Sequence, residues 1–276
     1  MRGLESNLTI ECLHPGVSAR RARVVLFDFD GTLSLIRTGW VDVMVPMMVE
    51  ILAGLKTGES EEELRALVED YVARLTGEQT IYQMIELARQ VERRGGKPLA
   101  PLAYKQMYHQ RLMDKIQWRR AELRQGKVSP DKYLVPGARA LLEALRARGL
   151  RLYCASGTDH IYTQEEARLL DIERYFDGGV YGALDDYQSF SKEILIRRIL
   201  TSTECRGDGL LGFGDGYVEI KNLKEAGGVA VGVATDEPEC RKVNPWKRQR
   251  LLSVGADFII ANFLCQEQLL RTLFPE

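Results

Sequence analysis

The stretch Val24–Leu33, VVLFDFDGTL, is an apolar run that ends in two carboxylates and a glycine. A continuous apolar run of this length is typical of a central strand in a parallel sheet that is covered on both faces. Because alternate residues of a strand point the same way, Asp28 and Asp30 are expected on one face. Gly31 permits a sharp turn that exposes backbone N–H groups. Ligands bind at such strand ends in open α/β sheets, so the stretch predicts a catalytic site rather than two solvated acids.

Further apolar runs of the same kind recur along the chain, and helical patterns separate them. Ala138–Arg148 places leucines on one stripe, and Ser191–Leu200 begins with a serine that is suited to cap a helix. This alternation predicts an α/β fold with a doubly wound parallel sheet and a Rossmann-like core. The other expected strands are Leu152–Ser156, Leu210–Asp215, Val229–Ala234 and Asp257–Ala261.

The segment from residue 37 to residue 133 shows no convincing strand pattern. Ser60 and Glu63 have the spacing of a capping box, at the start of a helical pattern. The chain therefore predicts an α/β core built from residues 1–36 and 134–276, with an all-helical domain inserted over residues 37–133. The helical segments expected in this insertion are Ser60–Leu75, Thr80–Arg94 and Pro101–Gln125.

The composition argues against several classes of partner. The chain has 276 residues, of which 45% are hydrophobic, and a formal net charge of −1. Such a balance provides no general attraction to nucleic acid or to anionic membranes, so neither is expected as a partner. No apolar run reaches the roughly 20 residues that cross a bilayer, and we expect no signal peptide. We expect a cytoplasmic protein; its oligomeric state is not predicted.

Cysteines and histidines do not suggest a metal centre of their own. The five cysteines are scattered without a C-x-x-C pair, and the three histidines are widely separated. Reduced thiols are therefore expected, and a histidine-based zinc site is not. The basic run Arg241–Arg250 contains Trp246, but we interpret it as a solvated loop that leads into a helix, because the rest of the chain is not basic.

Four separate segments together resemble the signatures of the haloacid dehalogenase (HAD) superfamily. Asp28–Thr32, DFDGT, resembles the first signature, and Ser156 at the end of LYCAS fits the second. Lys192, at the start of a helical pattern, fits the third. Gly214–Glu219, GDGYVE, resembles the fourth. The resemblance covers Val24–Leu33 and about residues 135–261. The helical insertion lies where the superfamily's C1-type cap is inserted, as in phosphoglycolate phosphatase-like members.

The resemblance implies a division of labour among the catalytic residues. Asp28 is the expected nucleophile, which forms an aspartyl-phosphate with the substrate. Asp30 is the expected general acid and base, which protonates the leaving oxygen and later deprotonates water. Lys192 is expected to neutralise charge on the phosphoryl group and to hold Asp28. The residues expected to bind the substrate phosphate are Thr32, Ser156, Gly157 and Gly31.

The resemblance also implies a Mg²⁺ cofactor. A phosphate dianion is repelled by an acidic cluster, and a hard cation with oxygen ligands offsets that repulsion. The implied ligands are Asp28, the backbone carbonyl of Asp30, and Asp215. Glu219 belongs to the same set, either as a direct ligand or in the outer shell, where it orients water or Lys192.

These signatures predict a phosphomonoester hydrolase that acts on a small phosphorylated metabolite of the sugar phosphate or phosphoglycolate type. Thr32 is the residue usual in phosphatases, although a sugar phosphomutase of the same superfamily remains an alternative. A non-catalytic signalling module that is phosphorylated on aspartate is a third hypothesis. Arg37 and Trp40, at the entrance to the insertion, are interpreted as a hinge-surface charge and a packing aromatic, with contact to the substrate as the alternative for each. Packing is also the interpretation of Tyr82, Met84, Tyr104, Met107 and Tyr108.

Overall fold

The computed structural model describes residues 10–184 and 186–276, and its centre is a seven-stranded sheet. The strand order is β1-β7-β6-β5-β2-β3-β4, and every neighbouring pair is parallel except β1 and β7. This arrangement confirms the predicted α/β fold with a mostly parallel sheet. The strands are β1 (Glu11–Cys12), β2 (Val24–Asp28), β3 (Arg151–Asp159), β4 (Gly179–Ala183), β5 (Leu210–Gly214), β6 (Val229–Val233) and β7 (Phe258–Ile260).

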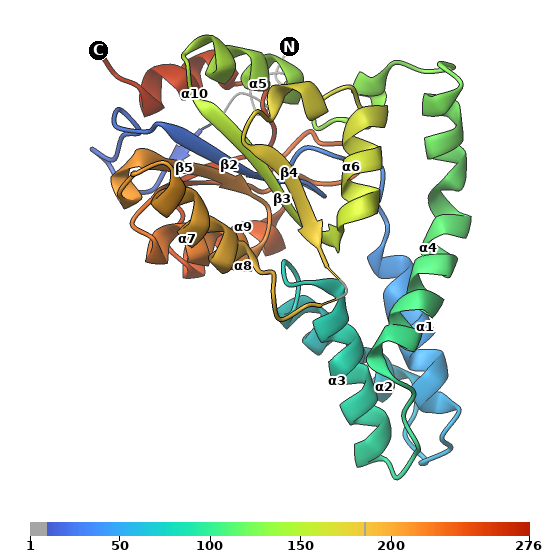
Figure 1. The fold of residues 1–276 in the computed structure, drawn as a ribbon. Coiled ribbons are helices and arrows are strands. Elements are labelled where there is room, and N and C mark those ends of the chain that lie inside the picture. The colour runs from blue at the N-terminus through green and yellow to red at the C-terminus, as the bar shows by residue number, and fades with distance from the viewer. Residues whose placement is uncertain (1–9, 185) are drawn as a thin grey trace.

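Helices cover both faces of the sheet (Figure 1). Val25 and Phe27 of β2 belong to one buried cluster, whereas Val24 and Leu26 belong to the other. A strand that alternates between two apolar clusters must be apolar at every position, which explains its unbroken run. The first cluster includes side chains of α5 (Ala138–Ala147), α6 (His160–Leu169) and α10 (Gln266–Leu273). The second includes side chains of α7 (Lys192–Ser202), α8 (Tyr217–Glu225) and α9 (Pro245–Ser253).

The insertion contains four α-helices. They extend away from the sheet (Figure 1). The Ser60 hydroxyl accepts a hydrogen bond from the Glu63 backbone at 3.2 Å, and the Glu63 carboxylate accepts one from the Ser60 backbone at 2.8 Å. This is the capping box that the sequence predicts, at the start of the second helix. The helices are α1 (Val41–Ala53), α2 (Glu61–Arg74), α3 (Thr80–Arg93) and α4 (Pro101–Arg124).

Within the described residues, no helix combines the length and the apolar character that crossing a membrane requires.

Replacement of Phe27 by alanine tests the packing of the first buried cluster, to which this side chain belongs. Phe27 is fully buried, and its ring stacks on Phe213 with 4.7 Å between centroids. We expect Phe27→Ala to lower the free energy of unfolding by about 3–5 kcal/mol, because a buried aromatic ring leaves a cavity. Urea denaturation measures the change. Leu264→Ala is the control, since Leu264 is 51% exposed and its replacement is expected to cost less than about 0.5 kcal/mol.

Candidate active site

The residues of the four signatures meet at the carboxyl ends of neighbouring strands. Asp28 is the last residue of β2, which lies between β3 and β5. Ser156 lies within β3, and Asp215 follows β5 directly. Because these strands are parallel, their carboxyl ends share one edge of the sheet. A cavity of about 110 Å³ at this edge is lined by all three residues and by Lys192.

Helix α7 begins at Lys192 and brings its side chain to the nucleophile candidate. Ser191 caps this helix by accepting a hydrogen bond from the backbone N–H of Ile194 at 3.0 Å. The Lys192 ammonium donates to Asp28 Oδ1 at 2.6 Å and also contacts the Glu219 carboxylate. Burial raises the pKa of Asp28, and the Lys192 charge opposes that increase. A buried carboxylate that is paired in this way can stay ionised and available as a nucleophile.

Asp30 lies in a different environment from Asp28. Its Oδ2 accepts hydrogen bonds from the hydroxyl groups of Ser156 and Thr158, each at 3.0 Å. Its Oδ1 is buried and has no hydrogen-bond partner among the described residues. Burial raises the pKa of Asp30 to about 6, although the nearby Arg37 charge acts to lower it. A carboxyl group with a pKa close to neutral can both release and accept a proton, as a general acid and base must.

Two of the predicted phosphate-binding residues do not line the cavity. Thr32 is fully buried, and its hydroxyl donates to Asp28 Oδ2 at 3.3 Å. The backbone N–H of Gly31 donates to the carbonyl of Ser34 at 2.9 Å. Ser156 and Gly157 do line the cavity. Direct contact of Thr32 and Gly31 with a phosphate group therefore stays a prediction.

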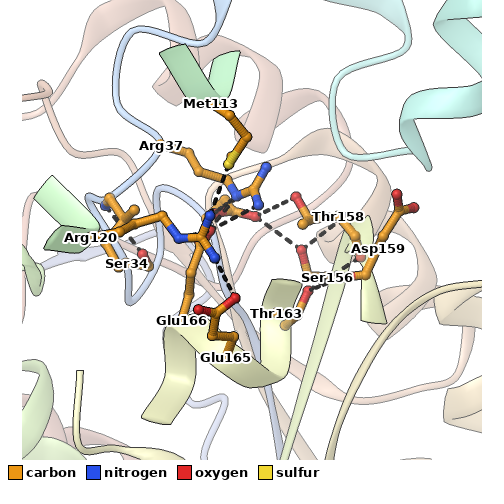
Figure 2. Close-up of polar contacts among 12 residues, drawn as sticks. Ser34, Arg37, Met113, Arg120, Ser156, Thr158, Asp159, Thr163, Glu165 and Glu166 are labelled. Carbon is orange, nitrogen blue, oxygen red and sulfur yellow. Dashed lines mark hydrogen bonds and ion pairs between the residues drawn. The ribbon is translucent and has the colours of Figure 1, made fainter. Parts of the chain in front are cut away.

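Arg37 is a buried member of the site, so its interpretation as a surface charge is wrong. Its side chain is 7% exposed and makes a bidentate pair with Glu166 of α6, with N–O distances of 3.0 and 2.9 Å. Arg37 Nε also lies 3.8 Å from Asp30 Oδ1. Arg120 of α4 approaches the same Glu166 carboxylate at 3.8 Å and contacts Glu165 (Figure 2). One buried carboxylate thus joins the general acid candidate, a core helix and the insertion.

Two residues that the motif pattern does not indicate lie near Asp215: Lys247 contacts it directly, and Glu237 contacts Lys247. Lys247 of α9 lies 2.8 Å from Asp215 Oδ2 and 2.7 Å from Glu237 Oε1. Thr38 donates to the other oxygen of Glu237 at 2.8 Å. A methyl group on Gly31 would lie 2.4 Å from Asp215 Oδ2, so glycine permits this close approach. Lys247 belongs to the basic run interpreted above as a solvated segment, yet its side chain is only 13% exposed.

The donors at this edge of the sheet fit a magnesium ion. Asp28 and Asp215 supply carboxylate oxygens, and the Asp28 charge contributes to the raised pKa of Asp215 after burial. Among the described residues, no group of three His, Cys, Asp or Glu side chains forms a ready-made metal cage. Mg²⁺ is commonly held by one or two carboxylates, with water and substrate phosphate completing its shell. Two carboxylates beside a cavity of about 110 Å³ match that pattern.

The insertion supplies the opposite wall of the cavity. A methyl group on Gly157 would lie 2.6 Å from the carbonyl oxygen of Glu78, so the insertion touches the core backbone there. The Gln79 amide donates to the carbonyls of Tyr187 and Phe190 at 2.9 and 2.6 Å. The interpretation of Trp40 and Tyr108 as packing residues alone is incomplete. Besides Arg37, the residues of the insertion that line the cavity are Trp40, Met44, Thr76, Gly77, Glu78, Thr80, Gln83 and Tyr108.

Comparison with known proteins places the chain in a family of hydrolases. A family model described as haloacid dehalogenase-like hydrolase matches residues 22–227. A 5'-nucleotidase of Pseudomonas aeruginosa is 33% identical over 97 residues, which are 35% of this chain and 43% of that protein. The chain therefore matches less than half the length of this curated relative.

Solved structures share the fold at low sequence identity. A predicted phosphoglycolate phosphatase from Haemophilus somnus superposes with a TM-score of 0.58 at 15% identity, covering 90% of this chain and 98% of that one. A haloacid dehalogenase-like protein from Streptococcus pneumoniae gives a TM-score of 0.57 at 18% identity, covering 90% and 97%. At these identities the likeness is one of fold.

Removal of Glu166 tests the buried ion pair. We expect Glu166→Ala to lower the free energy of unfolding by about 3–5 kcal/mol, because it leaves the Arg37 guanidinium buried without its partner. Urea denaturation followed by circular dichroism measures the change. Glu173→Ala is the matched control: its pair with Arg168 is exposed, and such pairs contribute about 0–1 kcal/mol. An equal, small effect of both substitutions would contradict the expected cost.

Proposed function

Because the chain belongs to the haloacid dehalogenase-like hydrolases, we propose that it is a Mg²⁺-dependent phosphatase that hydrolyses small phosphorylated metabolites through an aspartyl-phosphate on Asp28. The observation that carries the proposal is the contrast between two carboxyl groups two residues apart. Asp28 is paired with Lys192 at 2.6 Å, whereas Asp30 is held by two hydroxyl groups and has a pKa raised to about 6. One is suited to attack phosphorus, and the other is suited to carry a proton.

In the first step, a carboxylate oxygen of Asp28 attacks phosphorus in line with the ester oxygen. The phosphorus–ester oxygen bond breaks as the new acyl-phosphate bond forms, and the Asp30 proton passes to the leaving oxygen. Lys192 stabilises the charge on the phosphoryl oxygens from the side of α7. The alcohol product then leaves with the proton that Asp30 supplied.

In the second step, a water molecule attacks the phosphorus of the aspartyl-phosphate. Asp30, now ionised, takes a proton from this water, and the acyl-phosphate bond breaks. Inorganic phosphate leaves, and Asp28 regains its carboxylate. The hydrogen bonds from Ser156 and Thr158 keep the Asp30 carboxyl in place during both proton transfers.

The Mg²⁺ ion would be held by the carboxylates of Asp28 and Asp215 and by the backbone carbonyl of Asp30. When bound, it offsets the repulsion between the phosphate dianion and the acidic site; two unit charges 4 Å apart interact by about 4 kcal/mol at an effective dielectric constant of 20. The contact between Glu219 and Lys192 supports an outer-shell role, in which Glu219 orients the lysine.

The names of relatives support the reaction rather than one substrate. A 5'-nucleotidase and a phosphoglycolate phosphatase both release phosphate from a monoester, although their alcohols differ. Residues of the insertion and of the core together line the cavity of about 110 Å³, and a site of this size favours a small metabolite over a macromolecule. Release of inorganic phosphate from a sugar phosphate distinguishes the phosphatase from a phosphomutase, which returns an isomeric sugar phosphate.

Asp28→Asn tests the nucleophile. The substitution keeps the shape of the side chain but removes its charge, so we expect Mg²⁺-dependent hydrolysis of p-nitrophenyl phosphate to fall at least about 10³-fold. Absorbance of released p-nitrophenol measures the rate, and circular dichroism checks the fold. Asp208→Asn, at an exposed pair with Arg21, is the control and should keep full activity. Full activity in Asp28→Asn would remove the covalent mechanism.

Asp30→Asn tests the proton donor through the leaving group. An alkyl alcohol must be protonated as it leaves, whereas p-nitrophenolate is a stable anion. We therefore expect the rate constant for phosphoenzyme formation to fall about 10²–10⁴-fold with an alkyl phosphate and much less with p-nitrophenyl phosphate. Quenched-flow measurement with both substrates gives the ratio. Equal losses with both substrates would exclude Asp30 as the general acid.

A further inference from the structure

Arg37 lies at the start of the insertion and lines the cavity, but the wall contributed by residues 40–108 contains no basic side chain. Its polar members are Thr76, Glu78, Thr80, Gln83 and Tyr108, and the set has no lysine or arginine. A phosphomonoester whose phosphate lies beside Asp28 must place its alcohol portion toward this wall. The wall therefore meets the part of the substrate that distinguishes one phosphomonoester from another.

Cations in and near the cavity are already engaged by carboxylates. Arg37 pairs with Glu166 and Asp30, and Lys192 contacts Asp28 and Glu219.

Two lysines outside the cavity lining are paired as well. Lys105 of α4 contacts Asp159, and Lys247 bridges Asp215 and Glu237. A second anionic group on the substrate would have to compete with these carboxylates for each cation. Such competition is unfavourable, because it would leave a partly buried carboxylate without its partner.

Glu78 adds a negative charge to the same wall. Its side chain is half-buried in the loop before α3 and has no hydrogen-bond or ion-pair partner among the described residues. Burial raises the pKa of Glu78, whereas the Lys192 charge acts to lower it. A carboxylate or second phosphate on the substrate would face this group across a small cavity, and like charges repel there more strongly than in water.

Gln83 and Tyr108 offer neutral hydrogen bonds instead. Gln83 of α3 is 4% exposed and Tyr108 of α4 is 7% exposed, and both line the cavity. Neither side chain has a hydrogen-bond partner within residues 10–184 and 186–276. Buried amide and phenol groups are costly to leave unpaired, and each both donates and accepts, as an alcohol hydroxyl does. Met44 and Trp40 supply apolar surface for a carbon skeleton beside them.

We propose that this wall selects an uncharged, hydroxyl-bearing leaving group, so that the substrates are monophosphates of sugars or polyols rather than phosphorylated acids or bisphosphates. The inference rests on the proposed phosphatase function and narrows its substrate class. Gln83 and Tyr108 provide the hydrogen bonds to hydroxyl groups, and Glu78 disfavours a second anion. Phosphoglycolate, which carries a carboxylate two carbons from the phosphate ester oxygen, is excluded from the preferred class.

Matched substrate pairs test the proposal, because each pair differs only by a hydroxymethyl group in place of a carboxylate. The pairs are 2-hydroxyethyl phosphate with phosphoglycolate, glycerol 1-phosphate with 3-phosphoglycerate, and glucitol 6-phosphate with 6-phosphogluconate. In the pair that is hydrolysed fastest, we expect kcat/KM to be at least about tenfold higher for the alcohol. A smaller ratio, or a preference for the acid, overturns the proposal.

Variants of the wall test the residues assigned to it. Glu78→Gln removes the charge, and we expect the alcohol-to-acid ratio of kcat/KM to fall at least about threefold. Glu92→Gln is the matched control, since Glu92 is an exposed residue at the other end of α3 and its replacement should leave the ratio unchanged. An unchanged ratio in Glu78→Gln, or an equal change in Glu92→Gln, overturns the assignment.

Binding measurements separate recognition from turnover. Calorimetric titration of the inactive Asp28→Asn variant with both members of the deciding pair should show the same preference for the alcohol. If wild-type protein hydrolyses p-nitrophenyl phosphate but does not discriminate between pair members, only the substrate class is refuted. If it hydrolyses no phosphomonoester, the phosphatase function and the inference both fail.

Discussion

The pairing of a buried carboxylate with a buried ammonium group is the constraint on which this site depends. Asp28 ends a strand that is packed on both faces, so its carboxylate has little access to water. An isolated charge in such a place is costly, and Lys192 offsets that cost only because α7 begins where it does. Ser191 sets this start by capping the helix, and Glu219 of α8 holds the other side of the ammonium group. Three elements that are distant in the chain are therefore positioned by one charge.

A second buried charge links chemistry to architecture. The Glu166 carboxylate is fully buried in α6 and binds Arg37, which in turn lies beside Asp30. Arg120 reaches the same carboxylate from α4, so the insertion contacts the core through the group that neighbours the general acid candidate. The position of Asp30 and the contact between the insertion and the core thus depend on the same set of ion pairs.

Sequence patterns predicted the parts of this structure that depend on local chemistry. The strand that leads to Asp28, the capping box of α2 and the start of α7 all follow from short-range patterns. Strand β4, GVYGA, was missed because its glycines have low strand propensity, and β1 has only two residues.

The catalytic candidates were accessible from sequence because their order and strand context match the family signatures. Thr158, Glu166, Glu237 and Lys247 were not, since ordinary residue types acquire their importance only from neighbours that are remote in the chain. Arg37 was misjudged for the same reason: a lone arginine after a turn is usually exposed, and only the position of α6 provides its partner.

The absence of a side chain at position 157 has a consequence for access. Any larger residue there would meet the carbonyl oxygen of Glu78, so the two segments can approach this closely only with glycine. The distance between β3 and the loop that contains Glu78 therefore depends on the absence of a Cβ atom at position 157. A single methyl group at this point would push the two segments apart and open the cavity to solvent, while the side chains of Asp28, Asp30 and Lys192 stayed unchanged.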